Sequence, residues 1–415
     1  MTWGDLFCGG GGTTTGALGV PGVKVLWALN HSPSAIATHM ANHPETVHYQ
    51  SDILEQDESD LAPVDGIWMS SECVNFSNAK GGKLLDQGSR SLPMELIRFV
   101  KRCAPKIIIV ENVKEFMSWG PLDNGRPDKK RKGESFREWV SAVQGCGYPN
   151  YEHKVINAAD YGAYTSRSRY FGIFTQPGIE ISWPEQTHSK TGGDGYIKWN
   201  PCKDKLDLGN LGKSIFEKKL CRNTIKRIEA GLKKYGGDPF ILSFYGSDGK
   251  FNGCSLDDPL PTITTKDRHM VVNPPGKIQF ICSQYSSDKP EHMSHGIDSP
   301  IPTLTTSHAH MLVTQFLQMS YNSDGNPGSQ IRDIDSPSPT ITNTNKIALV
   351  TQTPGCGKNI NGDVFFRFIT IDEATALQGF PDGYVLLGTK AEQLRHIGNS
   401  VVPLVAMRLI EANYA

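Results

Sequence analysis

The sequence predicts an α/β fold in which a doubly wound, mostly parallel sheet carries an inserted β-rich domain. Strand-like and helix-like segments alternate from Met1 to about residue 185. After that point three related segments, at about 240–350, alternate Thr with Ile or Leu between turn residues. Helical periodicity returns at about residue 361. We therefore expect domains at 1–185 and 186–360, with 361–415 returning to the first domain.

The N-terminal part supplies the elements of this sheet in order. "VKVLWAL" predicts a strand, and "SPSAIATHMANH" predicts a helix capped by Ser32. "DGIWMS" and the apolar run "KIIIV" predict buried parallel strands, with the helical pattern "SLPMELIRFVKRCA" between them. "ESFREWVSAVQGCG" predicts a helix that ends at glycine. Such sheets bind ligands at the carboxyl ends of their strands. Asp5 with its glycine-rich loop, Cys73 and Glu111 all lie at such ends.

Composition limits the functions that the chain can have. Nine cysteines are scattered without a Cys-x-x-Cys pair, which argues against a zinc cage and for free thiols in a reducing compartment. The net charge of −1 means that a nucleic-acid partner needs locally clustered basic residues. No signal peptide precedes Asp5, and no apolar run is long enough to span a membrane. We expect a cytoplasmic protein with neither metal nor membrane partner.

Several motifs lie at the expected binding edge, and each has an ordinary alternative. "DLFCGGGGTTTGA" puts glycines after a strand, where a backbone can approach a ligand, although a flexible turn has the same composition. Glu111 is either an exposed strand end or a carboxyl group buried for hydrogen bonding. Arg167 and Arg169 share a strand face that suits anion contact, or they lie on a solvated edge. Cys73 is a nucleophile or an ordinary buried cysteine.

The order of these motifs resembles the cytosine-C5 DNA methyltransferase family. The glycine loop, "SSECVNFSNAKGG", "VENV", "SRSRYFGIF", "LQGFP" and "GNSVVP" follow one another as in that family, over Asp5–Phe174 and Arg367–Ala415. The resemblance implies a Rossmann-like fold that uses S-adenosylmethionine, with the repeats in the place of a variable target-recognition domain. It also implies double-stranded DNA as the substrate, and it allows a cognate restriction endonuclease as a partner.

The resemblance also implies roles for individual residues. Cys73 would attack C6 of a cytosine flipped out of the duplex. Glu111 would hold N3 and the exocyclic amine, and Arg169, with Arg167 beside it, would contact O2. Asn399 would close the site from the C-terminus, so that the two ends of the chain pack together. The expected cofactor contacts are Asp5, Phe7, Gly9, Gly11, Asn30, His31, Asp52, Ile53, Asn399 and Ser400.

The expected DNA contacts fall in three places. Ser77 and Lys80 belong to the loop that the resemblance predicts to close on DNA. "GRPDKKRKGE" is a phosphate clamp or a solvated charge run, and its basic residues are Lys129, Lys130, Arg131 and Lys132. The repeats share a Pro-x-Pro-Thr middle but differ in the tails that follow, which predicts base-reading residues or simple polar turns. The tail candidates are Lys266, Arg268, His269, His308, His310, Asn343 and Asn345.

Three departures from the family's pattern keep other functions open. Glu72 stands where proline is usual, and a carboxylate close to a thiol disfavours the thiolate unless the two side chains point apart. Asn30 replaces an acidic residue, and Thr165 replaces glutamine. The alternatives are a catalytically impaired DNA-binding relative and an RNA cytosine-C5 methyltransferase. A zinc deaminase is excluded because its His-x-Glu and Cys-x-x-Cys ligands are absent from the sequence.

Overall fold

The chain forms two compact units. The computed structural model describes residues 1–71, 92–123, 126–214, 220–235, 238–244, 251–266, 268–274, 280–283, 294–296, 310–313, 317–320, 331–332, 346–349 and 365–414. The first unit contains Met1–Asp207, Asp257–Asp267 and Ile369–Ala415, and the second contains Leu208–Leu256 and Arg268–Phe368. The segment Asp257–Asp267 therefore belongs to the first unit, although the sequence analysis assigned it to the inserted domain.

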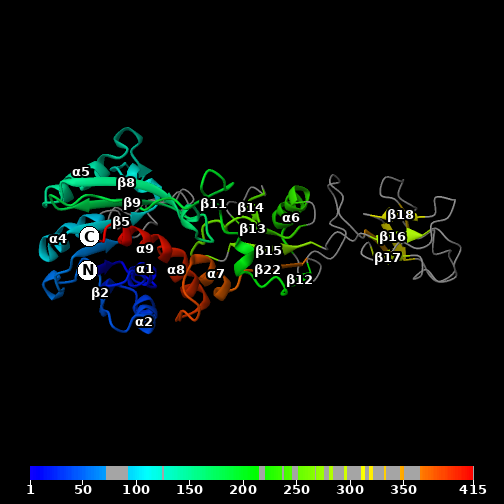
Figure 1. The fold of residues 1–415 in the computed structure, drawn as a ribbon, viewed down its shortest axis with the longest axis horizontal. Helices are drawn as coiled ribbons and strands as arrows, with labels where there is room; N and C mark the ends of the chain where they lie inside the picture. Colours follow the sequence, from blue (N-terminus) through cyan, green and yellow to red (C-terminus); the bar gives the residue numbers. More distant parts are fainter. Residues whose placement is uncertain are drawn as a thin grey trace. The chain divides into compact units, whose positions relative to one another are not determined.

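The first unit is built on a seven-stranded sheet with the order β3-β2-β1-β4-β5-β9-β8 (Figure 1). The strands from β3 to β5 are parallel, whereas β9 is antiparallel to both β5 and β8. This arrangement confirms the predicted doubly wound, mostly parallel sheet. The strands are β1 (Thr2–Leu6), β2 (Lys24–Asn30), β3 (Val47–Gln50), β4 (Gly66–Met69), β5 (Ile107–Asn112), β8 (Asn150–Asn157) and β9 (Ser168–Thr175).

Helices cover both faces of this sheet. The helices in the described part of this unit are α1 (Gly12–Leu18), α2 (Pro33–Asn42), α4 (Leu96–Cys103), α5 (Glu134–Gln144), α7 (Ile371–Gln378), α8 (Lys390–Asn399) and α9 (Pro403–Ala412). One apolar core joins α4 and α5 to the sheet through residues such as Phe99 and Trp139. A second core joins α1 and α9 to the opposite face through Ala17 and Leu409. Strand β5 is consequently buried along its whole length, as its continuous apolar run predicts.

Local signals in the sequence explain where several of these helices begin and end. Ser32 caps α2 by accepting a hydrogen bond from Ala35 N, and α5 ends at Gly145 as predicted. The C-terminal helical pattern is divided into α8 and α9 because Pro403, in the first turn of α9, starts a new helix. In the second unit, helix α6 spans Arg222–Tyr235.

The second unit is rich in strands, as the alternation of Thr with Ile or Leu predicts. It contains an antiparallel sheet of order β12-β22-β15-β13-β14 and two three-stranded sheets, β17-β16-β18 and β20-β19-β21. Helix α6 packs on the first of these sheets through Ile228, Leu242 and Met270. The strands are β12 (Lys213–Ser214), β13 (Phe240–Ser243), β14 (Gly253–Ser255), β15 (His269–Asn273), β16 (Phe280–Ser283), β17 (Ser294–Gly296), β18 (His310–Val313), β19 (Leu317–Ser320), β20 (Ile331–Arg332), β21 (Lys346–Leu349) and β22 (Phe365–Phe368).

Two short strand pairs complete the first unit. They are β6 (Leu122–Asp123) with β7 (Arg126–Pro127), and β10 (His188–Ser189) with β11 (Ile197–Lys198).

The two ends of the chain pack directly on each other within the first unit. A Cβ atom at Gly12 would overlap Ser400 Oγ. A Cβ atom at Gly16 would overlap Pro403 O and lie 2.8 Å from Ala406 Cβ. Helix α1 approaches α9 and the residues just before it this closely only because these two positions have no side chain. The expected packing of the C-terminal segment on the N-terminal glycine region is therefore present.

Replacing Gly16 with alanine tests this close packing. Alanine favours a helix by about 1 kcal/mol over glycine, so a gain in stability would be expected from α1 alone. We expect Gly16→Ala instead to lower the free energy of unfolding by about 1–3 kcal/mol, because the added methyl group would push α1 away from α9. Urea unfolding measures the change. Gly145→Ala is the control, since its Cβ would lie 3.3 Å from Ser141 O; equal effects of the two variants would contradict the packing.

Candidate functional site

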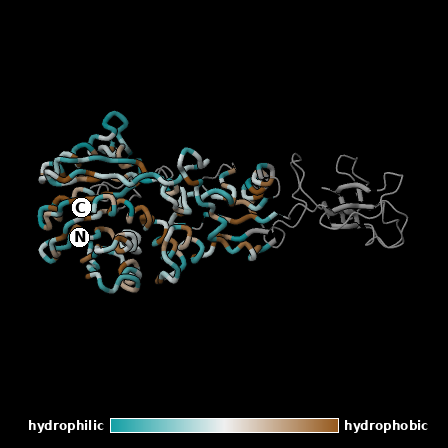
Figure 2. Tube along the Cα trace, viewed as in Figure 1, coloured by the Kyte–Doolittle hydropathy of each residue, from teal (hydrophilic) through white to brown (hydrophobic). Residues whose placement is uncertain are grey.

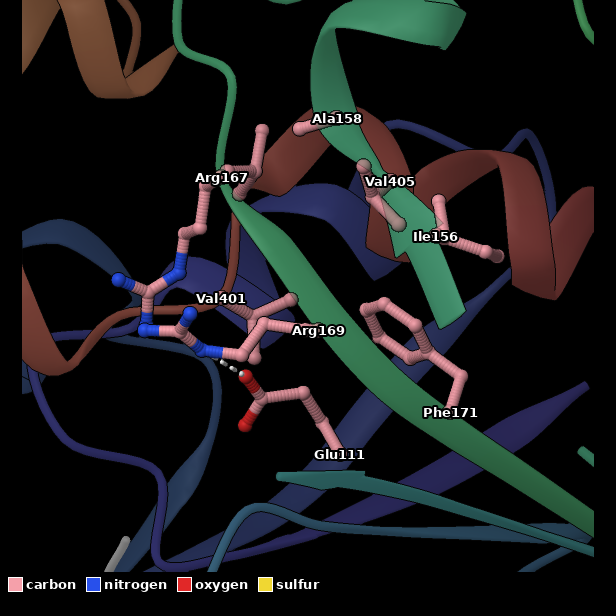
Figure 3. A pocket seen from close by; sticks show the side chains of 9 residues that line it. Glu111, Ile156, Ala158, Arg167, Arg169, Phe171, Val401 and Val405 are labelled. Carbon is pink, nitrogen blue, oxygen red and sulfur yellow. Dashed lines mark ion pairs between the residues drawn. The ribbon is translucent and has the colours of Figure 1, made fainter. Parts of the chain in front are cut away.

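The carboxyl end of β5 holds a buried acidic group beside two arginines. Glu111 Oε1 lies 3.3 Å from Arg169 Nε, and the side chains are 7% and 15% exposed. Arg167, Arg169 and Phe171 of the β9 region line the same small pocket as Glu111 (Figure 3). Both arginine side chains therefore line the same pocket, as predicted, although Arg167 precedes the first residue of β9.

Burial and positive charge act in opposite directions on Glu111. Burial raises the pKa of this carboxyl group, and the charges of Arg169 and Arg167 lower it only in part, so the pKa stays above its usual value. Glu111 consequently holds its proton to a higher pH than an exposed glutamate. A carboxyl group of this kind can both donate and accept a hydrogen bond.

Arg167 ties together three segments that are distant in the sequence. The residue is 3% exposed, and its Nη1 donates to Gly398 O at 2.9 Å and to Ile263 O at 3.5 Å. A Cβ atom at Gly398 would overlap the backbone of Thr264. The segment around Ile263 is thus held between the start of β9 and the end of α8. These contacts give Arg167 a supporting role next to the pocket.

The glycine-rich loop between β1 and α1 is open on one side and filled on the other. Gly9 and Gly11 have φ angles of 53° and 95°, which favour glycine, and Phe7 has a φ of 61°, which costs energy for a bulky residue. A Cβ atom at Gly9 would meet only Phe7 O, at 3.9 Å. A Cβ atom at Gly10 would instead lie 2.9 Å from His396 Cβ. The open side leaves room for a ligand against the backbone.

Asp5 lies at the base of this loop with one unsatisfied oxygen. Its residue surface is 1% exposed. Oδ2 accepts a hydrogen bond from Thr14 Oγ1 at 2.9 Å, whereas Oδ1 has no hydrogen-bond partner among the described residues. Burial raises the pKa of Asp5 to about 7, and the Thr14 hydrogen bond offsets only part of that rise. A buried, unpaired acceptor of this kind can receive a donor or a positive charge from a ligand.

The other expected cofactor residues lie at the carboxyl ends of β2 and β3 and at the end of α8. Asn30 ends β2, and its Oδ1 accepts from the Ser32 backbone N–H at 2.9 Å. Asp52 is exposed just after β3, and its Oδ1 accepts from the Leu54 backbone N–H at 2.9 Å. Because β1, β2 and β3 are adjacent parallel strands, their ends share one edge of the sheet. Beside them His31 is exposed and Ile53 is buried.

At the end of α8, Asn399 is exposed and Ser400 is buried. Ser400 Oγ donates to Val401 O at 2.8 Å. Ser400 lies where a Cβ atom at Gly12 would be. Ser400 therefore supports the glycine loop by packing against Gly12.

Two residues that the sequence analysis missed support the loop. Tyr384 Oη donates to Gly10 O at 2.6 Å, and His43 Nε2 lies 3.2 Å from the same Oη. Burial lowers the pKa of His43 to about 4, so the ring is neutral at physiological pH. Tyr384 follows a Pro-Asp-Gly turn, but no local pattern indicates that its hydroxyl group meets a loop at the other end of the chain.

The candidate DNA contacts are partly described. Cys73, Ser77, Lys80, His308, Asn343 and Asn345 lie outside the described residues. Lys129, Lys130 and Arg131 form a short 3-10 helix, and all three are exposed together with Lys132. Arg131 forms an ion pair with Glu134. The segment that contains β6, β7 and these residues is largely hydrophilic (Figure 2).

In the tail of the first repeat, His269 is buried, whereas a DNA contact requires an exposed side chain. Lys266 is exposed, and Arg268 is half-buried with its Nη1 donating to Phe244 O at 2.6 Å. His269 is only 1% exposed, and its Nδ1 lies 3.0 Å from Ser243 Oγ. A ring buried in this way cannot reach a base edge, so the expectation for His269 is wrong in this structure. His310 begins β18 opposite Ser283.

Among the residues that the structure describes, no group of three or more His, Cys, Asp or Glu side chains is placed to hold a metal ion. In the same part of the chain, no helix has both the length and the apolar character that crossing a membrane requires.

Comparison with known proteins links this geometry to one family. A model of the C-5 cytosine-specific DNA methylase family matches residues 1–237 and 256–414. The Type II methyltransferase M1.HphI of Haemophilus parahaemolyticus is 24% identical over 422 residues, which cover 99% of this chain and 86% of the relative. The Type II methyltransferase M.NgoPII of Neisseria gonorrhoeae is 30% identical over 180 residues, which cover 43% of this chain and 49% of that protein.

Solved structures share the fold of the chain. An E. coli prophage protein described as a DNA modification methyltransferase aligns with a TM-score of 0.53 at 20% identity, over 100% of this chain and 98% of that one. The Dnmt2 methyltransferase of S. pombe aligns with a TM-score of 0.51 at 14% identity, over 99% and 97% of the two chains. At these identities the likeness concerns the fold alone.

The raised pKa of Asp5 predicts a stability difference that depends on pH. A folded-state pKa of about 7, above the ordinary 3.8, means that ionisation of Asp5 destabilises the fold as the pH rises toward and beyond 7. An asparagine at position 5 cannot ionise, and its amide oxygen can still accept the hydrogen bond from Thr14 Oγ1. We expect Asp5→Asn to exceed the wild type in stability at pH 8 by up to about 4 kcal/mol, and to lose that advantage near pH 4. Denaturant unfolding across this pH range measures the difference.

Asp65→Asn is the matched control, with the opposite sign. Hydrogen bonds from Thr2 and the nearby Lys106 lower the pKa of Asp65, so its contribution to stability is present above the ordinary value and lost at acid pH. We expect Asp65→Asn to be less stable than the wild type at pH 7. A difference between Asp5→Asn and the wild type that does not change with pH would contradict a buried, titrating Asp5.

Proposed function

The chain belongs to the C-5 cytosine-specific DNA methylase family, and from this premise we propose how its own residues carry out cytosine-C5 methylation of double-stranded DNA. The observation that carries the proposal is the buried Glu111 carboxyl group beside Arg169 at the carboxyl end of β5.

Glu111 and Arg169 form a receptor for one edge of cytosine. Cytosine offers an acceptor at N3 and a donor amine at C4, and a protonated carboxyl group offers the complementary donor and acceptor. The raised pKa of Glu111 favours this protonated form. Arg169 adds a positive charge 3.3 Å from the same carboxyl group. Both groups stabilise the electron density that reaches N3 and O2 when a nucleophile adds to C6.

Cys73 is the nucleophile of this proposal, although it lies outside the described residues. The segment leading to it is tied to the site, because Asn112 Nδ2 donates to Ser71 O at 3.2 Å and to Ser71 Oγ at 3.1 Å. Strands β4 and β5 are adjacent and parallel, so their carboxyl ends share one edge of the sheet. The contact of Ser71 with Asn112, the residue after Glu111, supports the assignment of a nucleophile two residues further along the chain.

Cys73 and Glu111 carry the addition to the ring. The Cys73 thiolate forms a bond to C6, and the electron pair of the C5–C6 bond makes C5 nucleophilic while the Glu111 proton stabilises N3. C5 accepts a methyl group. Removal of the C5 proton by a base then restores the double bond and expels the thiolate. S-adenosylmethionine supplies the electrophilic methyl group when bound.

The glycine-loop region fits such a cofactor. The open backbone at Gly9 allows close approach of a ligand, and Asp5 Oδ1 is a buried acceptor without a partner among the described residues. We assign the cofactor contacts to the loop from Asp5 to Gly11, to Asn30, His31, Asp52 and Ile53 at the adjacent strand ends, and to Asn399 and Ser400. Phe7 keeps its strained backbone for this purpose.

The partners follow from this reaction. Double-stranded DNA is the substrate, and the exposed basic residues Lys129–Lys132 contact its phosphates. The repeats read the sequence of the site. A restriction endonuclease is a partner in the cell, as the Type II naming of M1.HphI suggests. The enzyme works in the cytoplasm of a bacterial or phage-infected cell.

Bisulfite sequencing of plasmid DNA from expressing cells tests the reaction. We expect cytosine protection at defined sites with the wild type, and a loss of about 100-fold or more with Glu111→Gln, which cannot transfer a proton to N3. Glu138→Gln, at an exposed position on α5, is the matched control and is expected to behave as the wild type. Binding of duplex DNA without any protected cytosine would favour the catalytically impaired relative. Methylation confined to cellular RNA would favour the RNA enzyme.

Alanine at Lys129, Lys130 and Lys132 tests the phosphate contacts. We expect weaker DNA binding and a shallower dependence of affinity on salt, with the methylated site unchanged, because phosphate contacts carry no base information. Fluorescence anisotropy at several salt concentrations measures both quantities. Alanine at the exposed Lys101 and Arg102 is the control, since the end of α4 leads to the opposite, amino-terminal edge of β5. If DNA affinity depended on salt concentration equally in the wild type and the triple variant, Lys129, Lys130 and Lys132 would not contact the phosphates.

A further inference from the structure

Asp5 and His48 lie in one row across the seven-stranded sheet, on either side of Ala28. Asp5 of β1 pairs with Ala28 of β2, and Ala28 pairs with His48 of β3. Residues in register on adjacent parallel strands point to the same face of a sheet. The carboxyl group and the imidazole ring therefore share one face and are separated by the width of one strand.

Thr14 and His39 bridge this distance with a continuous chain of hydrogen-bonding groups. His48 Nε2 lies 2.7 Å from His39 Nδ1, and His39 Nε2 lies 3.0 Å from Thr14 Oγ1. Thr14 Oγ1 lies 2.9 Å from Asp5 Oδ2. All three distances are typical of hydrogen bonds. The four side chains come from four different elements, β3, α2, α1 and β1, so the chain is a product of the fold rather than of a local motif.

This hydrogen-bonded chain runs from the surface into the interior. His48 is half-buried, whereas His39 and Thr14 are fully buried and Asp5 is almost so. Water can protonate His48 directly. The chain then offers a path from that ring to the buried carboxyl group.

The hydrogen atoms of the chain can be arranged in two directions. A neutral imidazole has one N–H donor and one acceptor nitrogen, and a hydroxyl group donates one hydrogen. When Asp5 is ionised, Thr14 donates to it, His39 donates to Thr14 from Nε2, and His48 donates to His39. When Asp5 Oδ2 carries a proton, all three hydrogen bonds reverse, and the N–H of His39 is then on Nδ1. The tautomer of His39 thus depends on the charge of Asp5.

One proton can pass along the chain without leaving a charge on the groups between its ends. His48 gains a proton from water and passes the hydrogen on Nε2 to His39 Nδ1. His39 gives the hydrogen on its Nε2 to Thr14 Oγ1, and Thr14 gives its own hydrogen to Asp5 Oδ2. His39 has then changed tautomer and Thr14 is again a hydroxyl group. The net change is the transfer of one proton from water to Asp5.

The other titratable groups that face the chain stay uncharged between pH 6 and 8. Burial, and then the charge of Asp5, raise the pKa of Cys8 well above its ordinary value. Burial likewise raises the pKa of the Tyr384 hydroxyl group. His43, whose ring centroid lies 4.9 Å from that of His39, has a pKa that burial lowers to about 4. The strand neighbours of Asp5 on β2 and β4 do not ionise.

Within the chain, Asp5 is the group that titrates near neutral pH. Burial raises its pKa to about 7. Burial, with the charges of the neighbouring histidines, lowers the pKa of His39, and burial also lowers the pKa of His48. Both rings are therefore mainly neutral at the pH at which Asp5 gains its proton.

We propose that His48, His39 and Thr14 form a proton relay that sets the charge of Asp5, and that the ionised carboxylate favours the cationic methyl donor over its neutral product. Asp5 Oδ1 has no partner among the described residues, so it can face a ligand. S-adenosylmethionine carries a positive sulfonium group, which its demethylated product lacks, and a carboxylate attracts that charge. The three relay residues are positioning residues that act on the cofactor through Asp5. The inference rests on the proposed function, which places the cofactor beside Asp5.

Nitrogen-15 NMR of the full chain with labelled histidine tests the relay without cofactor or DNA. A ring nitrogen with a hydrogen differs strongly in chemical shift from one without, so the spectrum shows the tautomer of each histidine. We expect His39 to carry its hydrogen on Nδ1 at pH 6 and on Nε2 at pH 8; His39→Gln identifies its signals. The same His39 tautomer at both pH values would overturn the relay.

Substitutions separate the relay from a purely structural role. Thr14→Val keeps the shape of the side chain but removes the hydroxyl group, so His39 should no longer change tautomer with pH. Thr14→Ser keeps the hydroxyl group and should retain the change. Asp5→Asn cannot ionise and should hold His39 in one tautomer. A tautomer change as large as that of the wild type in Thr14→Val or Asp5→Asn would overturn the relay, because another group would then cause it.

Isothermal titration calorimetry with S-adenosylmethionine tests the link to the cofactor. Because Asp5 has a pKa of about 7 and its ionised form should favour the cation, we expect binding to be about tenfold tighter at pH 8 than at pH 6. S-adenosylhomocysteine, the neutral product, should show a smaller change, and Asp5→Asn should remove most of the change for S-adenosylmethionine. Equal pH dependence in the wild type and Asp5→Asn would overturn the cofactor role. A tautomer change in a chain that binds neither ligand would overturn the proposed function and leave the relay in place.

Discussion

The burial of the Glu111 carboxyl group beside Arg169 is the constraint on which the rest of the catalytic unit depends. Burial raises the pKa of this carboxyl group because β5 is apolar and covered on both faces, by α4 and α5 on one side and by α1 and α9 on the other. Arg169 reaches it because β9 runs antiparallel beside β5. Two residues earlier, Arg167 binds Gly398 O and Ile263 O and so fixes α8 and the segment Asp257–Asp267 around the same pocket.

The glycine-rich loop explains why the C-terminal segment must return to the first unit. Gly9 and Gly11 give the loop its shape through their left-handed backbone conformations. Because the loop is open at Gly9, it needs support on its other side. His396, Ser400 and Tyr384 provide that support, and they leave no space for side chains at Gly10, Gly12 and Gly11 respectively. The cofactor region is thus completed by residues from both ends of the chain.

Local patterns predicted the elements of the sheet, and long-range contacts explain what they missed. The buried strand at Ile107–Asn112, the Ser32 cap and the shared face of Arg167 and Arg169 follow from runs, caps and period-two alternation. The assignment of Asp257–Asp267 to the first unit does not, because backbone hydrogen bonds to Tyr164 and Ser166 leave no signature in its side chains. His269 was taken for a base reader because its tail is polar; its pairing with Ser243 across two strands is invisible to local periodicity.

Covalent trapping tests the central claim, that Cys73 attacks a cytosine held by Glu111 and Arg169. Fluorine at C5 blocks the proton loss that precedes release of the thiolate, so duplex DNA with 5-fluorocytosine at a methylated site captures the enzyme during turnover. Incubation with S-adenosylmethionine followed by peptide mass spectrometry identifies the attached residue. The account predicts one adduct, on Cys73, and none with Cys73→Ser. An adduct on another cysteine, such as Cys8 of the glycine loop, or no adduct with an active enzyme would contradict it.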